Sequence, residues 1–348
     1  MKPHIPGRWH AQGLDAPRFR TGAEVVRHLG AVQSQLHDMS LWAIGRRCGR
    51  SMTELQSEFD ALAFRRTHVL RPTWHHVDLP DLYRLQALTA PRVHRLMAGQ
   101  RRELDIDDDL IERARLTTTD ALASGPLTRD ELAEAWAAAG ITGSGRRTSH
   151  LAAELEIACV MASGPMRGRQ HTYALIDPPA TGPVRDDLLA ELATTYGRGH
   201  GPFRAKDLAW WSSLTLTDAR RAVMLAALPM TTLDGDEYAL PREPLVEAAP
   251  PAAALLSNFD EYISYARDEA DYARISGTVH DVMRSMGLLF LDGALGGLWR
   301  RTVKASTVRV DVIPDTPLSA RARHAVEAEA ERFADFLGRT LDLGVEAA

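Results

Sequence analysis

The stretch "SGPLTRDELAEA", residues 124–135, lies at the centre of the pattern that decides the predicted fold. Its SGP triplet separates two helical segments, because glycine and proline both interrupt helices, and the Leu127-Thr128 step begins the second one. A longer helix is predicted over residues 145–164, and residues 165–177 predict a strand, a turn and a strand. Three helices followed by a β-hairpin are the element order of a winged helix.

The same order repeats further along the chain. Residues 192–224 predict a helix, a glycine-rich turn, a second helix, a short turn and a third helix. The glycine-rich turn is assigned to "GRGHG", residues 197–201, which does not match the GxGxxG pattern of a dinucleotide-binding loop. Residues 230–241 then predict a hairpin whose turn is Asp234-Gly235.

The rest of the chain is mainly helical by periodicity. Helices are expected at residues 21–30, 39–49, 51–62, 81–96 and 319–340. Thr21 is the expected N-cap of the first of these helices. Short strands are expected in residues 67–79 and in residues 287–313, where Asp292-Gly293 is a turn signal.

The predicted fold is therefore α+β, mainly α with short β-hairpins, and is built from three tandem winged-helix units and a C-terminal region of β-hairpin and helix. The expected boundaries are residues 1–116, 117–184, 185–249 and 250–348. Winged helices place helices and wings on the grooves and phosphates of duplex DNA, so DNA contact by at least one unit is favoured. The alternative is that some units serve dimerisation or act as scaffolds.

Composition sets the broad class of the protein. The 348 residues are 45% hydrophobic and 25% charged, which is typical of a globular protein with two or three domains. No apolar run reaches the roughly 18 residues of a membrane span, and the N-terminal residues do not match a secretory signal, so a cytoplasmic, nucleoid-associated protein is expected. Cys48 and Cys159 form no CxxC pair, and His75 and His76 point to opposite faces of a strand. We therefore expect no disulfide scaffold, metal or cofactor.

Charge is distributed unevenly along the chain. The net charge is −5, yet the basic residues gather in clusters at residues 64–71, 143–150, 165–171, 219–222 and 298–304. Lys2, Lys206 and Lys304 are the only lysines, and every other basic side chain apart from histidine is an arginine. Genomic codon bias is the simplest cause of this preference. Whatever the cause, the guanidinium fork suits bidentate contacts with phosphate.

The motif Gln33-Ser34-Gln35 places two long amides one residue apart within "LGAVQSQLHDMSLWAIGRR", residues 29–47. In an extended segment residues i and i+2 share a face, so both amides could reach one ligand. Judged by the residues alone, a structural role in capping a helix or bridging a loop is favoured. Neither GxSxG nor an activated Cys–His pattern is present, so covalent hydrolysis is unsupported. The acidic stretch at residues 257–273 is interpreted as packing plus a solvated face.

Five stretches taken together, in this order and at these separations, resemble the AlkZ-like family of bacterial winged-helix DNA glycosylases, which includes the YcaQ branch. They are "GAVQSQLHDMSLWAIGRR" (30–47), "THVLRPTWHHV" (67–77), "GPFRAKDLAWWSSL" (201–214), "LLSNFDEYISYARD" (255–268) and "LFLDGALGGLWRR" (289–301). The resemblance extends from about residue 15 to about residue 340.

The resemblance implies three tandem winged helices that form a concave, basic surface facing DNA. It implies a monofunctional glycosylase that hydrolyses the N-glycosidic bond of bulky or cationic alkylated purines in duplex DNA. N7-alkylguanine is the expected lesion, and some members also act on interstrand crosslinks. The implied partner is double-stranded DNA containing alkylated purines, with no membrane and no obligatory protein partner, and the implied role is DNA repair.

The resemblance also implies site residues. The family's QxQ catalytic motif falls on Gln33 and Gln35, where the YcaQ branch has QxD. A C-terminal hairpin approaches DNA in the family, and its match here assigns Arg300 and Arg301 to the DNA face. Within the basic clusters, Arg71, Arg146 and Arg147 are further expected DNA contacts.

The implied chemistry suits two amides. An N7-alkylated guanine already carries a positive charge and leaves without protonation, so the enzyme needs only a placed water and stabilisation of an oxocarbenium-like sugar. Amide carbonyls can orient that water without titrating. Two other classes stay open, namely a non-catalytic DNA-binding regulator or scaffold in which the motif is structural, and a winged-helix protein that binds another protein. Excision, a sequence-specific footprint, or the absence of salt-sensitive DNA binding would distinguish the three.

Overall fold

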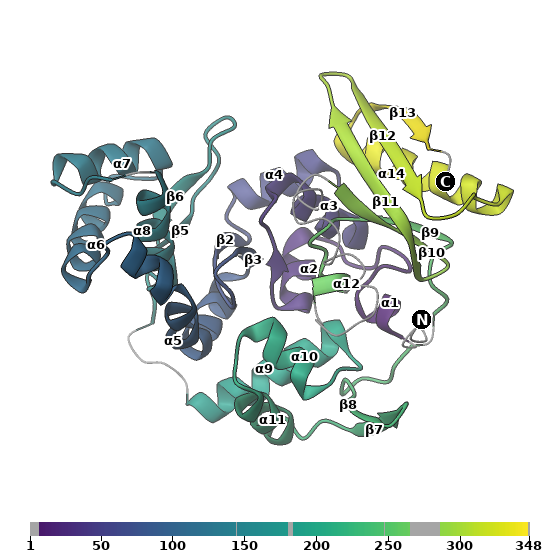
Figure 1. Cartoon of the computed structure of the whole chain (residues 1–348), viewed down its shortest axis with the longest axis horizontal. Helices are drawn as coiled ribbons and strands as arrows, with labels where there is room; N and C mark the ends of the chain where they lie inside the picture. The colour runs from purple at the N-terminus through teal and green to yellow at the C-terminus, as the bar shows by residue number, and fades with distance from the viewer. Residues whose placement is uncertain (1–6, 144, 180–183, 247, 265–285, 347–348) are drawn as a thin grey trace.

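The computed structural model describes residues 7–143, 145–179, 184–246, 248–264 and 286–346. Two arms stand on either side of a central part (Figure 1). Helices α6, α7 and α8 form one arm, and a five-stranded sheet with helix α14 forms the other. Helices α9, α10 and α11 lie beneath the central part, which holds the N-terminal helices and the segment with both glutamines.

The N-terminal part combines helices with a small antiparallel sheet of strand order β1-β3-β2. Its elements are α1 (Arg8–Ala11), α2 (Gly22–Leu29), β1 (Val32–Gln33), α3 (His37–Cys48), α4 (Met52–Asp60), β2 (Arg65–His68), β3 (Trp74–Val77) and α5 (Leu79–Glu103). The expected N-cap is confirmed, because the Thr21 hydroxyl accepts the backbone N–H of Glu24 at 3.1 Å. The one or two short strands expected within residues 67–79 correspond to β2, which begins earlier at Arg65, and β3.

The first arm follows the predicted order, with one strand added before α7. It contains α6 (Asp108–Leu122), β4 (Leu127–Thr128), α7 (Arg129–Ala138), α8 (Gly145–Ile157), β5 (Met161–Ser163) and β6 (Thr172–Leu175). The helix predicted to end at Gly164 ends instead at Ile157. Cys159 adopts φ 54°, and the N–H of Val160 bonds to the carbonyl of Leu155 at 3.0 Å, which together form a Schellman stop. The stop lacks the usual glycine, so the sequence pattern did not reveal it.

The third part contains α9 (Arg185–His200), α10 (Ala205–Ser212), α11 (Leu216–Leu225), β7 (Met230–Leu233) and β8 (Asp236–Ala239). The hairpin with its Asp234-Gly235 turn is confirmed, with φ of 49° and 85° at the two turn residues. The prediction that "GRGHG" forms a turn is wrong, since its first four residues form the last turn of α9. A Cβ on Gly199 would lie 3.1 Å from the carbonyl oxygen of His28, so glycine lets α9 approach α2 closely.

The second arm is a sheet of strand order β13-β12-β11-β10-β9. Its elements are β9 (Ala253–Leu256), β10 (Met286–Leu291), β11 (Ala294–Val303), β12 (Thr307–Pro314), α14 (Ala320–Leu337) and β13 (Thr340–Val345). Helix α12 (Glu261–Ser264) follows β9 in the chain but lies in the central part, beside β1. The Asp292-Gly293 turn and the closing helix are confirmed. Strand β13, which pairs in parallel with β12, was not predicted.

The N-terminal helices and this sheet share one hydrophobic core. The indole of Trp42 on α3 donates to the carbonyl of Leu255 on β9 at 2.8 Å, and the ring of Trp42 packs edge-on against Phe333 of α14. This joint core holds the glutamine segment between elements that are far apart in the sequence. In the described part of the chain, no helix has the length and apolarity needed to cross a membrane.

Candidate active site

The Gln33-Ser34-Gln35 segment lies at the end of strand β1. Gln33 pairs with His75 of β3 in an antiparallel register, and the N–H of Ser34 donates to the carbonyl of Trp74 at 2.8 Å. Gln35 lies in the bend that precedes α3. The side chain of Gln33 is half-buried, whereas Gln35 is exposed. The first amide is thus held in a sheet and the second projects from the loop that follows it.

A buried carboxylate holds the backbone of Gln33 from behind. Oε1 of Glu261 accepts the N–H of Gln33 at 2.8 Å, and Oε2 accepts the indole N–H of Trp211 at 2.8 Å. Nε2 of His200 lies 3.3 Å from the same Oε2. Glu261 is fully buried, and burial alone would raise its pKa. The hydrogen bond from His200 and the positive charge of Arg71 outweigh burial and lower the pKa of Glu261 to about 2.

The side chain of Gln33 is oriented by Arg71. The guanidinium donates to Oε1 of Gln33 at 3.2 Å and to Nε2 of His75 at 3.0 Å. Nδ1 of His75 lies 3.0 Å from the carbonyl oxygen of Thr73, so Nδ1 carries the proton and Nε2 is free to accept. Because arginine only donates, the Gln33 carbonyl must face Arg71. Arg71, expected as a DNA contact, therefore contacts the first glutamine of the motif.

The other expected DNA-contact arginines form contacts within the protein. Arg300 forms ion pairs with Asp311 and Glu346, and Arg301 pairs with Asp38 at 2.8 Å. Since Asp38 lies three residues beyond Gln35, the Arg301 contact links β11 to the glutamine loop.

Arg146 and Arg147 lie at the start of α8, on the opposite arm. Arg146 pairs with Glu103 at 2.9 Å, and Arg147 donates to the carbonyls of Thr142 and Asp105. The predicted residues thus fall on both arms, and Arg71 lies at the glutamines between them.

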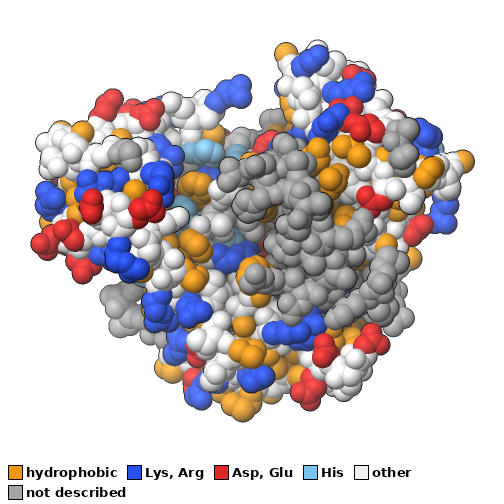
Figure 2. All heavy atoms as spheres, in the orientation of Figure 1, with side chains coloured by type: hydrophobic (Ala, Val, Ile, Leu, Met, Phe, Trp, Pro, Cys, Tyr) orange, Lys and Arg blue, Asp and Glu red, His pale blue; other side chains and the backbone are white. Residues whose placement is uncertain are grey.

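A notch separates the two arms at the surface (Figure 2). Basic side chains appear on both rims, where the β5–β6 hairpin faces the β11–β12 hairpin (Figures 1 and 2). Arg169 on the first hairpin and Lys304 on the second are exposed. The notch therefore has cationic side chains on both rims, an arrangement that attracts a polyanion even though the net charge of the chain is negative.

Comparison with known proteins identifies the family. The family model of AlkZ-like DNA glycosylases matches residues 26–336. The chain belongs to this family. Among solved structures, the DNA glycosylase AlkZ of Streptomyces sahachiroi is similar in fold, with a TM-score of 0.76, 21% sequence identity, and coverage of 98% of this chain and 97% of that one. A comparison with curated proteins found no match.

The family resemblance inferred from the sequence is thereby confirmed. The chain is a DNA-binding protein of the DNA glycosylase class, which takes part in DNA repair.

The sequence analysis did not predict three residues of the candidate site, namely Glu261, Trp211 and His200. The acidic stretch that contains Glu261 was expected to pack and to present a solvated face. Its first two acids, Asp260 and Glu261, are fully buried, and its residues from 265 onward lie outside the described residues.

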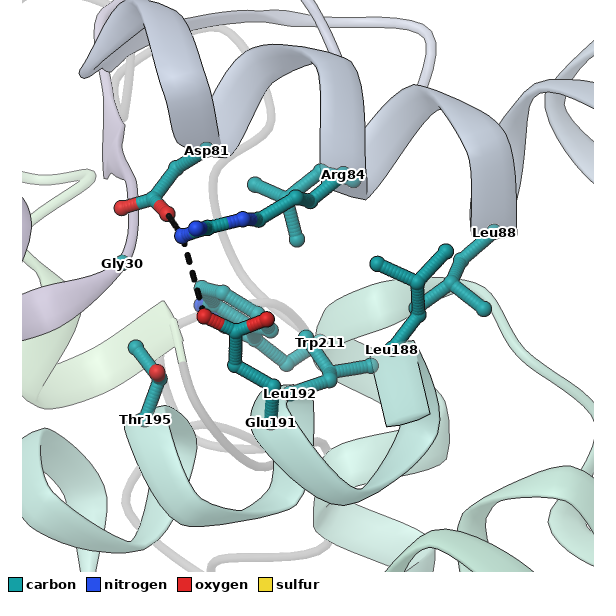
Figure 3. A pocket seen from close by; sticks show the side chains of 10 residues that line it. Gly30, Asp81, Arg84, Leu88, Leu188, Glu191, Leu192, Thr195 and Trp211 are labelled. Carbon is teal, nitrogen blue, oxygen red and sulfur yellow. Dashed lines mark hydrogen bonds and ion pairs between the residues drawn. The ribbon is translucent and has the colours of Figure 1, made fainter. Parts of the chain in front are cut away.

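A small cavity lies behind the site, at the seam between α5 and α9 (Figure 3). Its volume is about 30 Å³, which holds one or two waters at most. Arg84 crosses the cavity and pairs with Asp81 at 3.0 Å and with Glu191 at 2.9 Å, so the charged side chains that line the cavity are already paired with one another. Trp211 lines the cavity and donates to Glu261. The cavity belongs to the support of the site and is too small for a base.

Several histidines near the site are held neutral. Burial lowers the pKa of His75 to about 3 and that of His37 to about 4, and lowers the pKa of His76 well below its ordinary value. His37 packs against His76 and His171, with ring centroids 5.4 and 4.8 Å apart. Within the described ranges, no group of three His, Cys, Asp or Glu side chains is arranged to hold a metal ion.

Because these histidines are buried and neutral, the free energy of unfolding should fall in mild acid. His75 and His76 are fully buried and stay neutral in the native state, whereas each takes up a proton in the unfolded chain as the pH falls through about 6.5. Unfolding then binds protons, so the free energy of unfolding should fall by about 2–3 kcal/mol between pH 6 and pH 5. Glu261, with its lowered pKa, adds to the loss only below about pH 4.5. Urea unfolding at pH 7, 6 and 5 measures this, and a constant free energy across that range would contradict it.

Proposed function

We propose that this protein hydrolyses the N-glycosidic bond of cationic alkylated purines in duplex DNA, with N7-alkylguanine as the first substrate, and that it does not cleave the strand. The observation that carries the proposal is that the carboxylate nearest to the two glutamines is buried and is held by the backbone N–H of Gln33. Glu261 is fully buried, accepts N–H donors on both oxygens and has a lowered pKa, so it has no proton to give. A base that leaves from such a site must already be positively charged.

The proposed reaction separates departure of the base from attack by water. The N9–C1′ bond breaks with its electron pair moving to the base, which neutralises the positive charge of the alkylated ring. Water then adds to the oxocarbenium-like C1′ and loses a proton to solvent. Gln35, exposed beside the strand, and the remaining lone pair of the Gln33 carbonyl orient this water. The Glu261 anion behind Gln33 partly offsets the positive charge of Arg71 close to the cationic sugar.

Incubation with a duplex containing one N7-methylguanine tests the proposal. We expect free N7-methylguanine and a strand that breaks only after alkali at the abasic site. A break before alkali would contradict the absence of strand cleavage, and no released base would contradict the substrate. Binding without excision would point to the regulator or scaffold class instead. A duplex crosslinked through N7 of guanine tests, in the same assay, whether crosslinks are unhooked.

We also propose that residues 1–116, 117–184 and 185–249 are winged-helix units and that residues 250–348 complete a concave surface for DNA. The order of α7, α8, β5 and β6, with β6 between β4 and β5 in one sheet, supports the second unit. The order of α9, α10, α11 and the β7–β8 hairpin supports the third. Superposition of each range on a known winged helix tests the assignment.

The arginine contacts with DNA are proposed on the same basis, and they predict a salt effect. Replacing Arg300 and Arg301 with alanine should weaken binding to undamaged duplex and reduce the slope of log K against log salt by up to about two units, since each lost phosphate contact removes about one. Arg115→Ala is the matched control, because Arg115 pairs with Glu112 on α6, away from the notch. An unchanged slope in the double variant would remove β11 from the DNA face.

A further inference from the structure

Arg66 is fixed against the backbone of the glutamine motif. Its Nε donates to the carbonyl of Ser34 at 3.0 Å, and its guanidinium lies over the ring of Trp74 at 4.3 Å from the centroid. Trp74 in turn accepts the N–H of Ser34 through its carbonyl. The residue between the two glutamines is therefore bound on one side by an arginine and on the other by the strand that carries the stacking tryptophan.

The second feature of Arg66 is the balance of its charge within the described residues. No carboxylate in the described part of the chain forms an ion pair with Arg66, whereas buried Arg46, Arg47 and Arg204 each pair with one. The nearby carboxylate of Glu156 is taken by His68, through both the backbone N–H and the imidazole. Burial lowers the pKa of Arg66 to about 10, which still leaves it charged at neutral pH.

Apart from Glu156, the titratable groups around Arg66 are cationic or neutral. Arg129 is close enough to lower the pKa of Arg66 further, and His37 and His171, whose own pKa values Arg66 lowers, are neutral at physiological pH. The side chain of Arg66 is partly exposed to solvent. A partly desolvated cation without a counter-ion is costly unless a ligand supplies the negative charge.

We propose that Arg66 binds a phosphodiester oxygen of the damaged strand, next to the nucleotide whose sugar faces Gln33 and Gln35. The inference rests on the proposed glycosylase site and adds a positioning residue to it. Trp74 covers one face of the guanidinium and Ser34 takes its Nε–H, which leaves the edge formed by the two terminal nitrogens for a ligand. That edge presents two parallel N–H groups, which fit the two oxygens of a phosphate. Because Arg66 is hydrogen-bonded to Ser34, which lies between the two glutamines, a phosphate bound by Arg66 is held at a defined position relative to both amides.

The test is a binding experiment that needs no excision. The probe is a duplex with one tetrahydrofuran abasic-site analogue, in which single phosphates near the analogue are replaced, one at a time, by neutral methylphosphonates. Wild type should lose about tenfold or more in affinity at one or two of these positions, as expected for a charged hydrogen bond. Arg66→Gln, whose amide can still donate to Ser34, should bind about tenfold more weakly. The Arg66→Gln variant should no longer respond to methylphosphonate at one of the positions that are sensitive in wild type. At every other position it should respond as wild type does.

Two controls separate a phosphate contact from a structural role. Arg115→Gln should keep the whole wild-type profile, and melting curves report folding of each variant. Arg66→Lys keeps the charge and should keep the sensitive position, with weaker binding throughout. The proposal is overturned if Arg66→Gln retains the wild-type profile, or if wild type itself has no sensitive phosphate beside the analogue, a result that needs no variant to fold. If wild type has a sensitive phosphate beside the analogue but releases no N7-methylguanine, the proposed substrate is wrong and the phosphate contact of Arg66 stands.

Discussion

Alanine at Gln35 should lower the single-turnover rate of N7-methylguanine excision on the order of 10²–10³-fold, and alanine at Gln33 should have an effect of similar size, because each removes a preorganised polar contact. If both amides act on one water, the double variant should lose little more than the worse single variant. Gln35→Asp should keep part of the activity, because the resemblance to the family implies Asp at this position in its YcaQ branch. Excision by wild type and the four variants, measured under single-turnover conditions, checks the expectation.

Folding and DNA affinity are the controls for this experiment. Gln35 is exposed, so its replacement should change the melting temperature little. Gln33→Ala leaves Arg71 without one acceptor, but the guanidinium keeps its hydrogen bond to His75. A double variant that excises at the wild-type rate would remove the catalytic role. Unfolded variants would instead make the motif a structural bridge.

Replacing Glu261 should affect stability and excision together. Glu261→Ala removes the acceptor of the Gln33 N–H and of the Trp211 indole, and leaves these buried donors unsatisfied. We expect the free energy of unfolding to fall by about 2–6 kcal/mol, since each of the two donors left unsatisfied costs about 1–3 kcal/mol. Glu261→Gln keeps the volume but faces its donors with an amide N–H₂ group, so it should lose less stability while still displacing Gln33.

Glu329→Gln is the matched control for Glu261→Gln. Glu329 on α14 is also buried, and it pairs with Arg46 of α3 at 2.8 Å. Both variants should lose stability in urea, but only Glu261→Gln should lower the excision rate when the two are compared well below their melting temperatures. Equal excision rates in the two variants would show that Glu261 does not position the glutamines.

Local sequence signals predicted the elements that depend on neighbouring residues. Thr21 caps α2, and the turns at Asp234-Gly235 and Asp292-Gly293 close hairpins, because each signal acts within a few residues. The same reasoning failed where a distant contact decided the outcome. Helix α9 continues through Gly199, where the missing side chain lets α9 approach the carbonyl of His28 on α2, and that approach is not encoded near the glycine.

The sequence by itself determined the family, the helix-and-hairpin order and the two amides of the candidate site, because residue identity and short spacing carry that information. Only the tertiary structure decided what surrounds those amides. Arg71, Glu261 and Arg66 reach the motif from positions 38, 228 and 32 residues away from their partners there. The folded chain buries Glu261 beside His200 and Arg71, which keep it ionised, and pairs Arg66 with no carboxylate among the described residues. Both outcomes depend on chain segments that meet only after folding.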